Sequence, residues 1–341
     1  AAFVTPRESS VRGLAEQVAD GVVDDASAYR HAVASFEALK QLGFRYVKDP
    51  NGVAGKDSLD EIQFPRETLE SRVGDCDDLT VLYAATLEAM GIETAFVYVP
   101  GHILLAFDSQ YAPGASHRLG KAAFEHGGKL WVPIEATAIP DGFLAARARG
   151  MKEVNRWKKA GKLTLQPVHE AWQTHPPMAL PKGKVVVAVD KTALTGSAAK
   201  VMKALEAERS QSMAAVIKQA ARKAKGKRAS LESVHAYGLA LVRAENYPAA
   251  KDVFARAKAK APGDHVVAIN SMSLALLRGE SIDLKAYAEA VEVLDEAALY
   301  NNLGLAYFHS GDVEQAGKAF LAAAQGGNTR LAESLGLMAS Q

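Results

Sequence analysis

The sequence predicts two parts of different fold class: an α+β domain with a small antiparallel sheet, followed by an all-α repeat domain. Three observations support this division. Short runs rich in β-branched and aromatic residues lie within residues 92–136. Apolar residues at helical spacing lie on either side of these runs. From about residue 198 the chain becomes rich in alanine, and its last third repeats itself.

Composition limits the classes of function. With 341 residues, of which 48% are hydrophobic and 23% charged, the chain is long enough for two globular domains. The formal net charge is +1, so we expect no nucleic-acid partner. The chain contains no apolar run of about 18 residues, so we expect no transmembrane segment. Its single cysteine excludes an internal disulfide framework.

The first elements are expected to be helices. Within residues 1–43, apolar residues recur at helical spacing. Residues 44–63 are rich in Gly, Asp, Asn and Pro, which is typical of a loop. Pro65 suits the first turn of a short helix. The next helix begins at Cys76 and ends at Gly91, and its buried stripe consists of Leu79, Leu82, Tyr83, Leu87 and Met90.

Three strands are expected after this helix. The segments IETAFVYV (92–99) and HILLAFD (102–108) form two of them, and KLWVPIEA (129–136) forms the third. Residues 109–128 are expected to form a loop or a hairpin tip before the third strand. Helical periodicity returns in residues 142–161.

The C-terminal part contains an internal repeat. Four residues recur at an offset of 66 positions, which pairs Gly238 with Gly304, Ala250 with Ala316, Phe254 with Phe320 and Ala257 with Ala323. This offset is about twice the period of roughly 34 residues that marks the tetratricopeptide repeat, which these spacings resemble. Small residues at these positions let paired helices approach closely, with the phenylalanines filling the space between units. Such solenoids bind protein segments, although an inert supporting stack is the alternative.

These patterns divide the chain into three parts. We assign residues 1–185 to the first domain and residues 186–230 to a linker and helix. Residues 231–341 form three repeats, the middle one degenerate, with a capping helix near 329–339. Residues 198–230 contain nine Lys and Arg but only two Glu. This excess of positive charge is typical of a solvated helix or of contact with an anionic partner.

The only cysteine lies at the polar start of a helix. Asp75 is a suitable N-cap, and Asp78 three residues later completes a capping box. The positive end of the helix dipole favours the thiolate of Cys76. The acidic neighbours, including Asp77, act against this and raise the thiol pKa.

A nucleophilic thiol requires a base and a group that orients the base. His102 opens the second predicted strand, and Glu135 lies at the end of the third. If the strands form one antiparallel sheet, both side chains can lie near the start of the Cys76 helix. By spacing alone, other histidines stay open as the base or as surface residues, namely His31, His117 and His126.

A family resemblance favours His102 and Glu135 as the partners of Cys76. The segments FPRETLESRVGDCDDLTVLYAATLEAMGI, GHILLAFD and WVPIEAT resemble the transglutaminase-like superfamily, and in particular its bacterial branch, over roughly residues 1–180. The resemblance implies a papain-like fold with Cys76 as nucleophile, His102 as base and Glu135 as orienting acid. Two positions depart from the family pattern. The acid is commonly Asp, and His102 is followed by Ile103 rather than by the frequent Ala-Trp pair.

The resemblance implies an enzyme that transfers the acyl group of an amide in a protein or peptide substrate. Hydrolysis by a cysteine peptidase is our first expectation, with transamidation of protein glutamine, or a non-catalytic protein-binding scaffold, as the alternatives. Gln63 is a candidate oxyanion donor or only shapes its loop. No cofactor is expected to be required, but similar bacterial members hold calcium through acids beside the cysteine, which makes Asp75 and Asp77 candidate ligands. The resemblance and the missing initial methionine favour a bacterial periplasm or cell envelope over the cytoplasm, without deciding the compartment.

Overall fold

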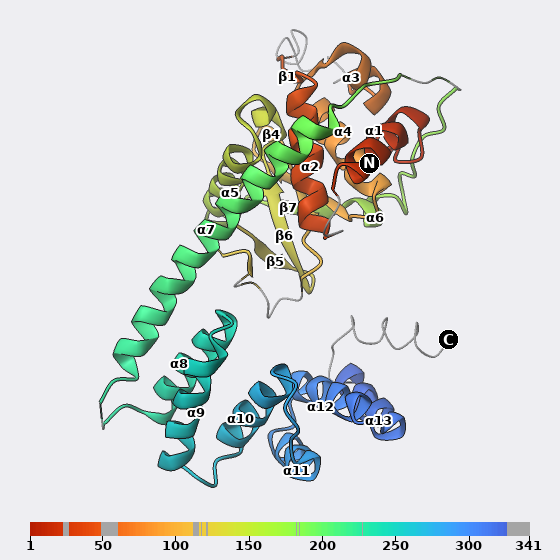
Figure 1. Cartoon of the computed structure of the whole chain (residues 1–341). Helices are drawn as coiled ribbons and strands as arrows, with labels where there is room; N and C mark the ends of the chain where they lie inside the picture. The colour runs from red at the N-terminus through yellow and green to blue at the C-terminus, as the bar shows by residue number, and fades with distance from the viewer. Residues whose placement is uncertain are drawn as a thin grey trace. The chain divides into compact units, whose positions relative to one another are not determined.

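A computed structural model describes residues 1–22, 27–48, 61–111, 116, 118–120, 122–181, 183, 185–226 and 228–325 (Figure 1). The chain divides into two compact units, residues 1–209 and 210–341. The predicted capping helix at 329–339 and His117 lie outside the described residues. Within the described ranges, no helix is both long enough and apolar enough to cross a membrane.

The first unit contains a curled antiparallel sheet of five strands in the order β5-β6-β4-β3-β7. The strands are β3 (Thr94–Val99), β4 (His102–Asp108), β5 (Phe124–His126), β6 (Lys129–Ile134) and β7 (Thr164–Pro167). The predicted strands correspond to β3, β4 and β6. The predicted hairpin tip supplies β5, and β7 pairs with β3 at the other edge. This mixed architecture agrees with the predicted α+β class.

Helices cover both faces of this sheet. They are α1 (Ser9–Asp20), α2 (Ala28–Gln41), α3 (Pro65–Ser71), α4 (Cys76–Ala89), the 3-10 helix η2 (Ala136–Asp141), α5 (Phe143–Lys159) and α6 (Val168–Ala171). A long helix, α7 (Lys191–Lys223), follows. Two short strands, β1 (Arg45–Tyr46) and β2 (Val73–Gly74), pair in parallel just before α4. They bring the segment after α2 next to the start of α4.

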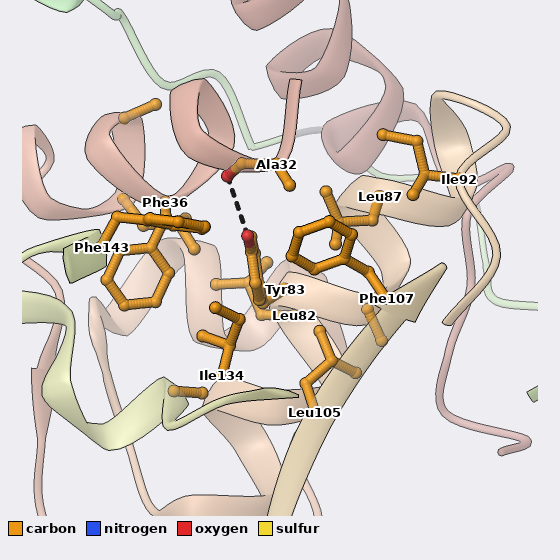
Figure 2. Close-up of a cluster of buried hydrophobic side chains, with 14 of the residues drawn as sticks. Ala32, Phe36, Leu82, Tyr83, Leu87, Ile92, Leu105, Phe107, Ile134 and Phe143 are labelled. Carbon is orange, nitrogen blue, oxygen red and sulfur yellow. Dashed lines mark hydrogen bonds between the residues drawn. The ribbon is translucent and has the colours of Figure 1, made fainter. Parts of the chain in front are cut away.

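The core on one face of the sheet is built around Tyr83 of α4 (Figure 2). This side chain is fully buried, and its hydroxyl donates a hydrogen bond of 2.8 Å to the carbonyl oxygen of Ala32. Phe36 meets the tyrosine ring edge-on at 5.4 Å, and Leu105 of β4 belongs to the same cluster. The burial of these side chains fixes α4 against α2 and β4, because large apolar groups gain most from leaving water.

The apolar run KVVVAV at 184–189 forms no regular element where the structure describes it. Two of its backbone N–H groups instead donate to side chains of α1, from Val185 to Ser10 and from Val189 to Gln17. Val187 and Val189 are buried in the core of the first unit. The run therefore lies in an extended segment along α1 and is fixed to that helix by these hydrogen bonds.

The described part of the second unit contains the end of α7 and, after it, three helix pairs. They are α8 (Leu231–Arg243) with α9 (Tyr247–Lys260), α10 (His265–Leu277) with α11 (Leu284–Leu294), and α12 (Ala297–His309) with α13 (Val313–Gln325). In the first and third pairs, a glycine faces a phenylalanine of the partner helix. A Cβ atom added at Gly238 would lie 2.3 Å from the Phe254 ring, and one at Gly304 would lie 2.5 Å from Phe320. The close approach predicted from the repeat pattern is therefore present within these pairs.

Replacing Gly304 with alanine should destabilise the second unit. The added methyl group cannot fit beside Phe320 without moving one helix, which costs about 1–3 kcal/mol of unfolding free energy. Gly317 on α13 is a matched control, because a Cβ there meets nothing within 4 Å. Gly317→Ala should stabilise by about 0.5–1 kcal/mol, as expected for an open helical site. Urea unfolding followed by circular dichroism compares the two, and equal stability of both variants would contradict the close packing.

Candidate active site

The start of α4 is held by a reciprocal cap. The Asp75 carboxylate accepts hydrogen bonds from the backbone N–H groups of Asp77 (2.9 Å) and Asp78 (3.2 Å). The Asp78 carboxylate accepts one from the backbone N–H of Asp75 at 3.1 Å, which confirms the predicted capping box. A Cβ at Gly74 would lie 2.5 Å from the Cβ of Asp78, so only glycine fits before this cap. The cap thus fixes the position of Cys76, the first residue of the helix.

The thiol of Cys76 lies between the helix start and the first residues of β4. It donates a hydrogen bond to Oδ1 of Asp77 at 3.5 Å, and the backbone N–H of Ile103 donates to the sulfur. The pairing of β4 with β6 begins only at Leu105, so Ile103 lies beyond the ladder on that side. In the described part of the chain, the hydrogen bonds of the thiol go to these two groups and not to His102.

The surroundings of the thiol favour its neutral form. Burial, followed by the charges of Asp77 and Asp75, raises the pKa of Cys76 to about 12, and the hydrogen bond from Ile103 acts in the opposite direction. The direction agrees with the effect expected from the acidic neighbours and opposes that of the helix dipole. The thiolate therefore has to be generated by a base rather than existing at neutral pH in this arrangement.

His102 and Glu135 form a hydrogen-bonded pair. Nε2 of His102 lies 2.7 Å from Oε2 of Glu135, and the glutamate is nearly buried. In the β4–β6 register, Leu105 pairs with Ile134, so Glu135 lies one residue past the last pair and diagonal to His102. Nδ1 of His102 makes no hydrogen bond within the described ranges. The pair therefore leaves Nδ1 as the nitrogen that can exchange a proton with another group.

The contact shifts the pKa values of both partners toward their charged forms. The hydrogen bond to Glu135 raises the pKa of His102, although burial of the ring works against it. Burial tends to raise the pKa of Glu135, but hydrogen bonds from His102 and Thr137 outweigh it and hold this pKa below its ordinary value. The two shifts together favour an imidazolium beside a carboxylate, which is how an orienting acid supports a catalytic histidine.

Two tyrosines that carry no sequence signal lie near the start of α4, Tyr46 within the field of Cys76 and Tyr98 within that of Asp77. Tyr46 pairs with Gly74 in the β1–β2 ladder, and Tyr98 pairs with Ile103 in the β3–β4 ladder. Each of these residues is 44% exposed. Burial and then the charges of Cys76, Asp75 and Glu135 raise the pKa of Tyr46, which places its phenol within the field of the site. No local motif marks these residues, because the pairing of distant segments brings them here.

Gln63 lies close to the start of α4. Its backbone N–H donates to Oδ1 of Asp78 at 2.7 Å, and its side-chain oxygen accepts from Ser71 at 3.4 Å. These bonds anchor the segment before α3 to the cap of α4. An oxyanion role for its amide group stays a prediction.

Among the described residues, the aspartates do not form part of a metal-binding cluster. The carboxylates of Asp75 and Asp78 accept backbone N–H groups, and no group of three His, Cys, Asp or Glu side chains in the described ranges is arranged to hold a metal. These residues alone therefore do not supply the oxygen-rich shell that calcium prefers. Calcium binding by Asp75 and Asp77 stays a prediction, and we assign no chemistry to it.

The alternative histidines occupy other places. His31 lies on α2, and His126 ends the edge strand β5, separated from β4 by β6. Only His102 of these described histidines is hydrogen-bonded to Glu135. The geometry therefore favours His102 as the histidine of the site.

Comparisons of the chain with models of protein families, with curated proteins and with solved structures found no match.

Proposed function

We propose that this chain is an enzyme that uses Cys76 to transfer the acyl group of an amide in a protein or peptide, mainly to water. The observation that carries the proposal is the contact of the sulfur with the backbone of Ile103, next to a His102 whose far nitrogen is bound to Glu135. The thiol therefore lies at the start of β4, where His102 is the first residue of the strand and is hydrogen-bonded to Glu135. The sequence resemblance to transglutaminase-like cysteine peptidases supports the same assignment.

The reaction begins with a protonated thiol. Nδ1 of His102 accepts the proton as the sulfur of Cys76 attacks the amide carbonyl carbon and the carbonyl π electrons move to oxygen. The imidazolium, stabilised by Glu135, then protonates the leaving nitrogen as the C–N bond breaks and a thioester forms. Water, deprotonated by the same imidazole, attacks the thioester and releases the carboxylic acid and the thiol.

The helix start provides one donor for the oxyanion. Asp75 caps the N–H groups of Asp77 and Asp78, which leaves the backbone N–H of Cys76 uncapped among the described residues. A helix N-terminus also carries partial positive charge, which stabilises developing negative charge. In the proposed transition state, this N–H donates to the former carbonyl oxygen.

A mechanism-based test uses a thiol-directed acylating probe and intact mass. Wild-type protein should gain one acyl group, Cys76→Ala none, and His102→Ala should acylate far more slowly. His126→Ala is the matched control, because that residue lies on the edge strand β5, and it should behave as wild type. Equal acylation of the His102 and His126 variants would exclude His102 as the base.

Product analysis decides between hydrolysis and transamidation. We favour hydrolysis, since no sequence motif marks an amine pocket and water is always present. With a peptide substrate and excess primary amine, the carboxylic acid should be the main product. A dominant amide adduct would make the enzyme a transglutaminase with the same catalytic residues.

The pH dependence should report His102. The reaction needs neutral imidazole, and the bond to Glu135 raises its pKa, so the acid limb of kcat/KM should lie above the pKa of about 6.5 of an ordinary histidine. Glu135→Gln removes the charge that raises the pKa and should move the limb to lower pH. An acid limb that stays in place in this variant would assign it to another group.

We also propose that the helix pairs of the second unit recruit the protein substrate. A cavity of about 650 Å³ lies between α10, the turn at 279–282, α11 and α12. Leucines form much of its wall, and Ser273 and Tyr287, joined by a hydrogen bond of 2.8 Å, contribute polar groups. Leu277 and Leu305 at this cavity are 59% and 44% exposed. An apolar pocket with few polar groups and exposed leucines suits apolar side chains of a protein segment.

Leu305→Glu should then lower kcat/KM for the protein substrate by about tenfold, because a charge replaces an apolar contact worth about 1.4 kcal/mol. Turnover of a small acyl ester should not change. Leu321→Glu is the control, since Leu321 is 55% exposed on α13 and does not line the cavity. If both variants lose equally on the protein substrate, the cavity is not the recruiting surface.

A further inference from the structure

Both oxygens of the Glu135 carboxylate are held in place. Oε2 faces His102, while Oε1 accepts two hydrogen bonds from Thr137, one from its hydroxyl at 2.6 Å and one from its backbone N–H at 3.2 Å. Thr137 lies in the first turn of η2, and Glu135 is the N-cap of this helix. The carboxylate is thus clamped between a strand residue and a helix turn.

The backbone of Glu135 is fixed as well. Its N–H donates to the carbonyl oxygen of Ala146 in α5, and its carbonyl oxygen accepts from the N–H of Ala138. The freedom that remains lies in the side chain. A glutamate has one more rotatable bond than an aspartate, so its carboxylate needs an additional contact to keep one orientation.

We propose that Thr137 is a positioning residue whose hydroxyl holds Oε1 of Glu135 and so keeps Oε2 directed at Nε2 of His102. The inference rests on the proposed function, because it assigns Thr137 a part in orienting the proposed base. Thr137 acts through Glu135 and takes no part in bond making or breaking.

Geometry separates this role from simple helix capping. The backbone N–H of Thr137 already caps through Oε1, so the cap does not need the hydroxyl. The hydroxyl adds a shorter bond to the same oxygen, and a donor to a charged carboxylate is stronger than one to a neutral group. Together with the bond from His102, it keeps the carboxylate ionised in a buried position.

The test replaces Thr137 with valine, which keeps the β-branched shape and the backbone N–H but removes the hydroxyl. The first readout is the Nε2 proton of His102 in ¹⁵N-labelled protein, which NMR detects without any substrate. In Thr137→Val this proton should exchange with water about tenfold faster, because a looser carboxylate protects it less. Thr137→Ser retains a hydroxyl and should restore the wild-type exchange rate.

Turnover is the second readout. Thr137→Val should lower kcat by about tenfold and leave KM unchanged, because Thr137 does not contact the substrate. Thr86→Val is the control for loss of a buried threonine hydroxyl, since Thr86 donates to Leu82 within α4 and is far along the helix from Cys76. This variant should leave the His102 proton and kcat unchanged.

The outcomes distinguish failure of the positioning role of Thr137 from failure of the proposed acyl-transfer function. If Thr137→Val leaves the His102 proton as in wild type, the positioning role is wrong, whatever the activity. If the proton changes as expected but the thiol of wild-type protein is not acylated and no amide substrate is turned over, the positioning role stands and the proposed function is wrong. A loss in Thr137→Val that Thr137→Ser does not restore would show that the hydroxyl is not the group responsible.

Discussion

Cys76→Ala is expected to reduce turnover of an amide substrate by a factor on the order of 10⁶, which leaves no enzymatic activity to measure in practice. The reason is chemical, since alanine offers no atom that can form the thioester. The chain contains no other cysteine that could substitute. The variant should fold, because the cap of α4 is made by Asp75 and Asp78 and not by the thiol. Initial rates with a fluorogenic peptide, together with a circular dichroism spectrum, check both points.

The other two residues should rank below the nucleophile. His102→Ala should lose almost as much activity as Cys76→Ala, because members of such a set act as a unit. Glu135→Gln should lose less, on the order of 10²–10⁴, as for orienting carboxylates in comparable sites. Asp252→Asn, at an exposed carboxylate on α9, is the control and should keep full activity. A Cys76→Ala protein as fast as wild type on a genuine substrate would refute the proposed mechanism.

Local signals in the sequence predicted the elements around the site well. Asp75 and Asp78 flank an apolar stripe, which marks both the start of α4 and its cap. The strands β3, β4 and β6 are short apolar runs bounded by turn residues, a pattern that favours strands. The spacing from Gly304 to Phe320 likewise indicated two helices in close contact.

Other features depend on contacts between distant segments. Strand β7 is a four-residue segment that ends at Pro167, and its alternation of Leu165 with polar neighbours is too short to predict a strand. It is a strand because β3 offers a free edge, which no local rule reveals. The same holds for Tyr46, which reaches the site through a two-residue strand paired with residues far along the chain.

The site itself was predictable only in its residue types. His102 and Glu135 were selected because strands of one sheet can bring them together, and their hydrogen bond could not be read from spacing. Thr137 carried no signal, since a threonine two residues after an acid is common. The sequence also left open whether the pKa of the Cys76 thiol is raised or lowered, because the helix dipole and the aspartates act in opposite directions on it. That balance can be measured directly.

The native thiol should react slowly with iodoacetamide at neutral pH. Its pKa rises from 9.0 to about 12, mainly through burial and next through Asp77 and Asp75. A rise of about three units leaves about a thousandfold less thiolate, and the greater nucleophilicity of a basic thiolate offsets part of this. Alkylation of the native protein should therefore be about 30–60-fold slower than that of the same protein unfolded in urea at the same pH. Because Cys76 is the only cysteine, intact mass follows it without interference.

Asp77→Asn identifies the cause of this difference. The variant removes the negative charge whose oxygen accepts the thiol hydrogen bond, so the thiol pKa should fall, and a fall of about one unit makes native alkylation about threefold faster. Asp252→Asn should leave the rate unchanged. Unfolded rates should be alike in all three proteins, since the folded arrangement creates the effect. If native wild type reacts as fast as the unfolded chain, the folded arrangement does not raise the pKa of the Cys76 thiol, and the expected suppression of its thiolate is wrong.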